Sequence, residues 1–268
     1  YMEQQYNDSR ARIIGSLVLL NVGVLVMGSL VSYLLARRTL QPIEDALEAQ
    51  NRFTADASHE LRTPLTTMKT EIEVALRDPK LPIADARNLL ESNIEEIDRL
   101  SKLADGLLIL ARTGDKPDLQ KVPVADLAKK VAKRFDAMAK QKDIMITRQL
   151  HGVTAQADPA HADAIIGILL DNAIKYGTPK TAVTLVVVKQ DNQACVTVHN
   201  EGPGIATEDL PNIFERFYRA DTSRTGGKTA GYGLGLSIAY KLATHMNGTI
   251  AVKSNKSGTT FTLRVSVA

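Results

Sequence analysis

The sequence predicts a membrane helix, then an α-helical hairpin, then an α/β sandwich, and three observations support this prediction. Residues 13–35 are uncharged and largely apolar. Two stretches with helical periodicity follow, separated by a turn with two prolines at residues 78–82. From about residue 121, alternating runs typical of strands are mixed with helical stretches, which is the pattern of a sheet with helices packed against it.

The apolar segment from Ile13 to Leu35 is long enough to cross a bilayer. A helix rises about 1.5 Å per residue, so this one reaches across a hydrocarbon core about 30 Å thick. It is longer than the core of a signal peptide and no cleavage site follows, so we expect a retained, single-pass helix of the cell membrane. Arg37 and Arg38 come directly after it and suit a cytoplasmic boundary. Residues 1–12 are then an extracytoplasmic stub, residues 36–42 a juxtamembrane linker, and the rest is cytoplasmic.

Residues 43–113 are expected to form the hairpin. Pro42 suits the first turn of a helix, and helical periodicity then runs to about Arg77. The second helix carries an apolar stripe made of Leu90, Ile94, Ile97, Leu100, Ala104, Leu107 and Ala111. Because a lone hairpin has one open apolar side, we expect two copies to pair into a dimeric four-helix bundle. A linker is expected at residues 114–120.

The C-terminal part, residues 121–268, is expected to fold as the α/β sandwich. We predict helices at residues 123–141, 159–175, 207–216 and 234–246. We predict strands at residues 144–150, 154–157, 181–189, 193–200, 248–255 and 259–267. The single cysteine, Cys195, lies in one of these alternating runs and should be a buried strand residue.

Composition excludes two classes of site. The net charge is only +3 and aromatic residues make up 4% of the chain, so basic residues are not interleaved with stacking aromatics. We therefore expect no nucleic-acid binding. No group of cysteines and histidines has the spacing of a zinc site.

One histidine of the predicted hairpin, His59, is a candidate nucleophile because of its position on the helix. The apolar residues around it recur every three or four positions, at Phe53, Ala57, Leu61, Leu65 and Met68. With about 100° of rotation per residue, His59 falls nearly opposite this stripe, Thr63 shares its face and Glu60 is adjacent. A solvent-exposed histidine beside a carboxylate can act as a nucleophile oriented by its neighbour, although such a histidine taken alone is most often plain surface.

Four patches of the C-terminal part are consistent with a nucleotide site. In the first, Asn172 offers an amide oxygen to Mg2+, Lys175 can reach a phosphate and Tyr176 has a flat face for a base, although a helix C-cap is the alternative. The second is a glycine turn at residues 200–205, and the third places arginines beside aromatic residues at 213–219. In the fourth, glycines at residues 231–235 open a helix, whose freed amides can bind phosphate. The polar segment 220–230 between the last two patches has the composition of a mobile lid.

In this order, the motifs resemble those of HisKA-type transmembrane sensor histidine kinases of two-component systems. Residues 59–65 resemble the H box, 171–176 the N box, 200–205 the G1 box, 214–219 the F box, 231–236 the G2 box and 258–261 the closing motif. The resemblance covers residues 43–268 and implies an ATP-binding domain of the Bergerat type, as in gyrase and mismatch-repair ATPases.

The resemblance implies that the chain autophosphorylates His59 from Mg-ATP and transfers the phosphoryl group to an aspartate of a response regulator's receiver domain. The catalytic residues are then His59, Glu60 and Thr63, and Thr63 could also hold the water that dephosphorylates the partner. Asn172 is the implied Mg2+ ligand. The implied nucleotide-binding residues are Asn172, Lys175, Tyr176, Asn200, Gly202, Gly204, Ile205, Arg216, Arg219, Gly231, Gly233, Leu234, Gly235, Leu236 and Thr259.

The sequence departs from the family pattern in several places. Asn200 replaces the aspartate that meets the adenine amino group, so that hydrogen bond is uncharged and weaker. Ile168 stands where the family often has a polar residue, four residues before Asn172. About 17 residues separate Pro42 from His59, too few for a full HAMP unit. The chain opens without a sensor domain, so we expect a chain truncated at the sensor end or an unusually small input region.

Two other functions stay open on the residues alone. An ATP-hydrolysing machine of the gyrase or mismatch-repair type would need a carboxylate where Ile168 stands. A non-catalytic signalling scaffold is favoured by Asn200 and Ile168 and opposed by His59 and the intact glycine boxes. Whether each His59 receives phosphate from its own ATP-binding domain or from the partner's depends on how the hairpin turn twists.

Overall fold

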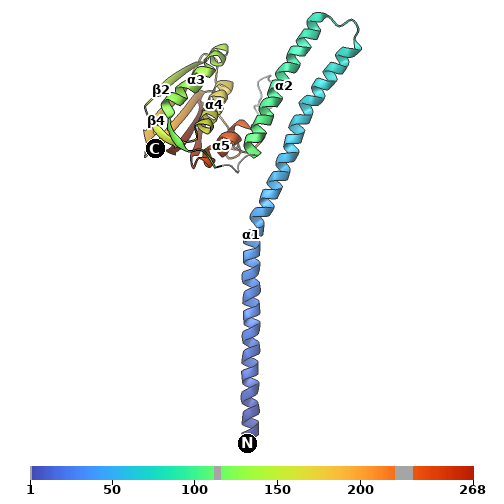
Figure 1. Cartoon of the computed structure of the whole chain (residues 1–268), viewed down its shortest axis with the longest axis vertical. Helices are drawn as coiled ribbons and strands as arrows, with labels where there is room; N and C mark the ends of the chain where they lie inside the picture. Colours follow the sequence, from blue (N-terminus) through green and yellow to red (C-terminus); the bar gives the residue numbers. More distant parts are fainter. Residues whose placement is uncertain (1, 112–115, 221–231) are drawn as a thin grey trace. The chain divides into compact units, whose positions relative to one another are not determined.

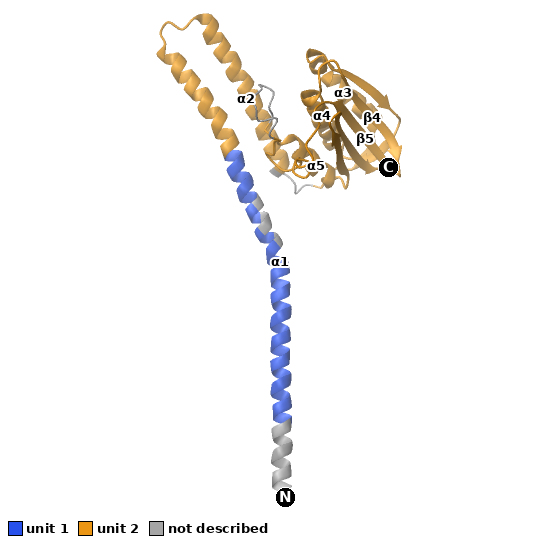
Figure 2. Cartoon of the chain, turned by 180° about the vertical axis from the view of Figure 1, so that it is seen from behind, with its two compact units in different colours: residues 1–58 blue, residues 59–268 orange. Residues whose placement is uncertain are grey.

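The chain divides into two compact units, Tyr1–Ser58 and His59–Ala268 (Figure 2). The computed structural model describes residues 2–111, 116–220 and 232–268, without the side chains of residues 2–12, 42, 45, 46, 49 and 111. The first residues of the expected linker, 114–115, and nearly all of the expected lid, 221–230, lie outside this description.

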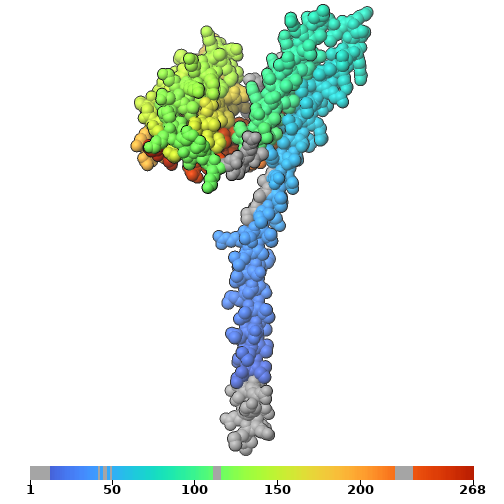
Figure 3. Space-filling model, viewed as in Figure 1, coloured from blue at the N-terminus to red at the C-terminus, as the bar shows by residue number. Residues whose placement is uncertain are grey.

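Helix α1 runs without interruption from Met2 to Arg77. The predicted helix start at Pro42 is therefore wrong, because the chain is already helical long before it. A proline inside a helix removes one backbone hydrogen bond, and the ladder continues on both sides. The stretch Ile13–Gln41 has a mean hydropathy of 2.2 and is long and apolar enough to cross a membrane, by length and composition. Its side chains are uncovered along its length (Figure 3).

The predicted hairpin turn is present between α1 and α2 (Ile83–Ala111). The carboxylate of Asp78 accepts a hydrogen bond from the Lys80 amide at 2.9 Å, and the Leu81 amide donates to the Asp78 carbonyl at 3.2 Å. This Asx-type turn, together with the two prolines, ends the first helix and allows the second to begin. Met68, Asn93, Leu103 and Leu110 are buried.

Two sheets form the α/β part. The larger has the order β2-β4-β5-β7-β6, in which only the β2–β4 pair is parallel. Its strands are β2 (Met145–Leu150), β4 (Ala182–Gln190), β5 (Gln193–Glu201), β6 (Thr249–Asn255) and β7 (Gly258–Ser266). The smaller pairs β1 (Gln120–Pro123) with β3 (Thr154–Ala157) antiparallel. Cys195 is buried in β5, as predicted.

Three helices cover one side of the larger sheet, namely α3 (Val124–Gln141), α4 (Pro159–Tyr176) and α5 (Gly235–His245) (Figure 1). Alternate residues of each central strand point into the layer between sheet and helices, as Leu185, Val198 and Phe261 do side by side in register. Helix α4 is the most buried of the three because Ile165, Ile166, Leu169 and Leu170 are fully covered. The sandwich core therefore lies under α4.

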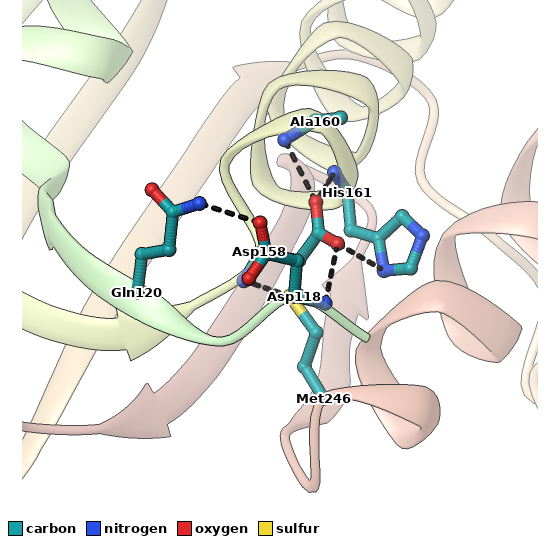
Figure 4. Close-up of polar contacts among 6 residues, drawn as sticks. All are labelled: Asp118, Gln120, Asp158, Ala160, His161 and Met246. Carbon is teal, nitrogen blue, oxygen red and sulfur yellow. Dashed lines mark hydrogen bonds and ion pairs between the residues drawn. The ribbon is translucent and has the colours of Figure 1, made fainter. Parts of the chain in front are cut away.

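The N-terminus of α4 is fixed by Asp158 (Figure 4). Its carboxylate accepts hydrogen bonds from the amides of Ala160 and His161, at 2.9 and 3.1 Å, and from the amide of Asp118, at 3.1 Å. Asp118 belongs to the segment that leads into β1, so the cap also ties the entering chain to the domain. Burial alone would raise the pKa of Asp158, but these amides and the nearby His161 outweigh it and lower the pKa.

Two element predictions fail. Residues 207–217 form successive tight turns and no helix, with bonds such as Asn212 N to Asp209 O at 2.9 Å. Pro211 interrupts the amide series there, and Phe217 has a positive φ of 61°. Strand β1 was not predicted. Its first residue falls in the expected linker at 114–120 and its last in the expected helix at 123–141, and a four-residue strand that pairs with β3 has too short a pattern to recognise.

Candidate functional site

Two buried polar residues lie side by side at one end of the larger sheet. Asn200 in β5 pairs in register with Thr259 in β7, and both are among the few buried polar residues. The Asn200 amide nitrogen donates to the Glu201 carbonyl at 3.3 Å, which orients its side-chain oxygen as an acceptor. An acceptor inside an otherwise apolar layer suits a ligand that presents a flat, hydrogen-bonding edge.

The glycine turn after β5 is held against two neighbouring elements. Gly204 has a φ of +73°, and a Cβ there would lie 1.9 Å from the Asn255 carbonyl oxygen, so only glycine fits. The Ile205 amide donates to Ser254 Oγ at 2.8 Å, and that hydroxyl also lies 2.7 Å from Thr259 Oγ1. A Cβ on Gly202 would lie 2.6 Å from the Tyr176 carbonyl oxygen. The turn therefore packs against the end of α4 and the β6–β7 hairpin.

The last turns of α4 present the polar residues predicted there. Asn172 and Lys175 are partly exposed, and the ring of Tyr176 is exposed. Lys175 Nζ lies 2.5 Å from Asp171 Oδ2, an ion pair that the sequence analysis did not anticipate. Lys175 must exchange this carboxylate for a phosphate if it is to bind one.

The N-terminus of α5 lies next to Asn172. A Cβ on Gly235, the first residue of α5, would lie 4.0 Å from Asn172 Nδ2 and 3.3 Å from Ile168 Cγ2. The N-cap residue Leu234 makes no side-chain capping bond, so within the described residues the first amides of α5 can bind an anion. Gly233 has a φ of +71°, and its carbonyl accepts from the Phe217 amide at 3.1 Å. The structure thus brings the first, second and fourth sequence patches together, and the bond from Phe217 joins the third patch to the fourth.

For the remaining predicted residues, the structure gives burial and few contacts with the rest of the site. Arg216 is exposed and Arg219 partly exposed. Burial lowers the pKa of Lys241 on α5, and the charge of Arg216 lowers it further. The side chain of Leu234 is buried and that of Leu236 partly so. Gly231 lies outside the described residues.

On α1, His59 is exposed and Glu60 is partly covered. Thr63 is exposed as well, and its hydroxyl donates to the His59 carbonyl at 3.2 Å. This back-bond keeps the hydroxyl close to the helix, one turn from the histidine, and leaves its oxygen available as an acceptor.

Sequence reasoning missed a set of contacts between α2 and the start of α5. The Tyr232 hydroxyl donates to Glu96 Oε1 at 3.3 Å, and Lys241 Nζ donates to the Leu110 carbonyl at the end of α2. Burial and the charge of Glu96 raise the pKa of Tyr232 to about 12. The signal available in the sequence was a second stripe on α2, with Leu103, Gly106 and Leu110 at helical spacing.

The donor set fits Mg2+ better than other metals. Among the described residues, no group of three or more histidines, cysteines, aspartates or glutamates could hold a metal ion. Mg2+ typically takes one or two protein oxygens and completes its shell with phosphate oxygens and water. The Asn172 amide, beside the N-terminus of α5, could supply one such oxygen.

Two family models match the chain. The His Kinase A (phospho-acceptor) domain matches residues 49–116, and the histidine kinase-, DNA gyrase B- and HSP90-like ATPase matches residues 157–268. The chain belongs to the sensor histidine kinases. The predicted order of a helical hairpin and an α/β ATPase domain is thereby confirmed.

Relatives and solved structures agree with this family. The chain is 33% identical to the sensor protein CiaH of Streptococcus pneumoniae over 247 residues, which are 90% of this chain and 55% of that protein. The structure of full-length ShkA in complex with AMPPNP is 26% identical, with a TM-score of 0.58 over 80% of this chain and 45% of that one. The histidine kinase ThkA, in complex with the response regulator TrrA, has the same fold, with a TM-score of 0.66 at 20% identity over 84% of this chain and 64% of that one. The chain spans about half the length of the curated relatives it matches.

Proposed function

We propose that this kinase phosphorylates His59 from Mg-ATP and then transfers the phosphoryl group to an aspartate of a response regulator. The observation that carries the proposal is the closeness of Gly235 to Asn172, which puts the N-terminus of α5 beside a side-chain amide. The exposed His59 on the hairpin supplies the acceptor that such a nucleotide site requires.

The nucleotide is expected to lie between the sheet end and the N-terminus of α5. Asn200, next to Thr259, would accept from the adenine amino group, and Tyr176 would cover the base. The glycine turn would line the nucleotide site, because Gly202 and Gly204 let it pack closely against the end of α4 and the β6–β7 hairpin. Mg2+, held by Asn172, would neutralise phosphate charge. ShkA, solved with AMPPNP, supports a nucleotide in this family.

The chemistry is a phosphoryl transfer to nitrogen. A ring nitrogen of His59 forms a bond to the γ-phosphorus, the bond from that phosphorus to the bridging oxygen breaks, and ADP leaves. Glu60 would orient the ring and accept its other proton, and Lys175 would stabilise the charge on the transferred group after leaving Asp171. Ile168 next to Gly235 supplies no carboxylate to activate water, so this geometry favours transfer to His59 over ATP hydrolysis.

The phosphoryl group would then pass to a receiver domain docked beside His59. ThkA, solved with its response regulator, supports a partner of this kind. We also propose that Thr63 holds the water that removes phosphate from the partner. The apolar stretch of α1 would anchor the kinase in the cell membrane, with residues 43–268 in the cytoplasm, and the hairpin would pair with a second copy.

Incubation with γ-labelled ATP tests the proposal. We expect acid-labile label on the wild-type protein and none on His59→Gln, with ATP affinity nearly unchanged because the nucleophile and the nucleotide pocket lie in different domains. His151→Gln, which changes another exposed histidine, should label normally. Label retained on His59→Gln would place the acceptor elsewhere. Release of free phosphate without protein label would indicate a hydrolase, and neither product would indicate a scaffold.

A further inference from the structure

The lysine proposed to contact the transferred phosphate already has an anionic partner in its own helix. Lys175 Nζ lies 2.5 Å from Asp171 Oδ2, one turn back along α4. The two side chains are only 30% and 32% exposed, so water and salt screen this ion pair less than a fully exposed one. Another anion can use Lys175 only after the ion pair has opened.

The backbone that carries this pair is held in place by α3, which lies beside α4 (Figure 1). Lys142, the C-cap residue of α3, donates from Nζ to the Lys175 carbonyl at 3.3 Å. Directly after α4, a Cβ on Gly177 would lie 3.0 Å from Ile144 Cδ1, so the chain is tightly packed there as well. The end of α4 is therefore fixed, and Lys175 changes its partner by turning its side chain.

The alternative partner for this lysine would bind at the N-terminus of α5. Asn172 and Ile168 lie within 4.0 and 3.3 Å of a Cβ placed on Gly235, the first residue of α5. With about 100° of rotation per residue, Lys175 lies about 60° around α4 from Asn172 and about 40° from Asp171. These side chains share one face of α4, so a phosphate at the first amides of α5 would lie on the same side of the helix as the ion pair.

We propose that Asp171 competes with the γ-phosphate for Lys175 and thereby lowers the preference of the site for ATP over ADP. The proposal rests on the proposed function, in which Lys175 stabilises the transferred group. ATP must displace Asp171 to gain that contact, so the free energy of the ion pair is subtracted from its binding. ADP has no γ-phosphate and binds with the ion pair intact. Once the phosphoryl group has moved to His59, Lys175 returns to Asp171.

Asp171→Asn tests the competition, because it removes the charge and keeps the size of the side chain. Calorimetric titrations of the full chain carry His59→Gln as well, so that no phosphoryl transfer disturbs them, and compare Mg-ATP with Mg-ADP. We expect the Kd for Mg-ATP to fall roughly two- to fivefold, the range expected for one ion pair near a protein surface. The Kd for Mg-ADP should stay unchanged.

Two controls separate this competition from a general effect of charge. Asp163 of the same helix pairs with Arg134 at 2.6 Å and is 30% exposed, so Asp163→Asn removes a matched ion pair away from the proposed phosphate site and should change neither Kd. Asp171→Asn added to Lys175→Met should also change neither Kd, because the lysine for which the two anions compete is gone.

An equal or weaker affinity of Asp171→Asn for Mg-ATP would overturn the proposal, since Asp171 would then hold Lys175 in place for the nucleotide. The same gain for Mg-ADP, in Asp163→Asn or in the Lys175→Met background would contradict it in favour of a general effect of charge. Failure of the proposed function is distinguishable, because the wild-type chain would then take no label from γ-labelled ATP, whatever affinities the variants show.

Discussion

A single amide side chain, that of Asn172, lies beside the helix N-terminus proposed to hold phosphate. We expect Asn172→Ala to abolish magnesium-dependent binding of ATP and autophosphorylation, because the metal loses its protein ligand while the sheet and helices stay in place. Calorimetric titration with and without Mg2+ measures the effect. Asn88→Ala, the same change on an exposed part of α2, should bind like wild type. Equal Mg-ATP affinity in Asn172→Ala and wild type would exclude the metal-ligand role.

The Thr63 hydroxyl is proposed to act in dephosphorylation of the partner and not in phosphoryl transfer to it, so one substitution can separate the two activities. Thr63→Ala keeps the helix and leaves His59 and Glu60 in place, so transfer to the partner should continue. Dephosphorylation of the partner should slow by roughly tenfold to a hundredfold, because a positioned hydrogen bond to the attacking water is lost. The half-life of the phosphorylated regulator measures this. Thr67→Ala, whose hydroxyl makes the same kind of back-bond one turn further from His59, should behave like wild type. Equal acceleration by Thr63→Ala and wild type would assign the water to another group.

Among the elements, α4 is stabilised by its N-cap residue Asp158, and we expect this contribution to the stability of the fold to depend on pH. Asp158→Ala should lower the stability at pH 7 by about 1 kcal/mol, because three amides lose their acceptor. The folded-state pKa of Asp158 lies below its ordinary value of 3.8, so the charged carboxylate stabilises the fold above that value and the benefit is lost as pH falls through the folded pKa. Thermal unfolding from pH 7 to pH 2.5 should therefore show the gap between wild type and Asp158→Ala closing in acid.

Asp158→Asn provides the matched control for this cap. An asparagine oxygen caps a helix about as well as aspartate, so most of the stability at pH 7 should remain. Since the amide does not titrate, the stability of this variant should lack the acid-dependent loss of wild type. A gap between Asp158→Ala and wild type that is the same at pH 2.5 as at pH 7 would show that the carboxylate charge plays no part.

For the whole molecule, an exposed apolar face of the hairpin points to a second copy. Leu65, Ile72, Leu90, Ile94 and Ile97 are all exposed in the single chain. A bundle of two hairpins would cover such a face, and the His Kinase A domain implies dimerisation. We expect Ile97→Glu to weaken the dimer at least about a hundredfold, since it buries a charge without a partner. Light scattering over a dilution series measures the mass. Lys102→Glu, an exposed position on another side of α2, should remain dimeric, and a dimeric Ile97→Glu would move the interface elsewhere.

The order of elements was predictable because each depends on neighbours in the chain. The turn between α1 and α2 follows from two prolines and Asp78, and the strands from alternation that the register of β4, β5 and β7 confirms. The motifs that contain Asn172, Asn200 and Gly235 were likewise recognisable, because glycine and amide residues stand at spacings that few other sites need.

The same patterns could not predict contacts between segments that are far apart in the sequence. Strand β1 exists only because β3 supplies its partner, and residues 207–217 form tight turns because Pro211 breaks the amide series. The pairing of Lys175 with Asp171 depends on which rotamers the neighbouring helices leave open. The packing of α5 against Gly106 brings together residues that are more than a hundred positions apart in the sequence. Periodicity reports which face of an element is buried, whereas its partner is chosen by packing across the whole fold.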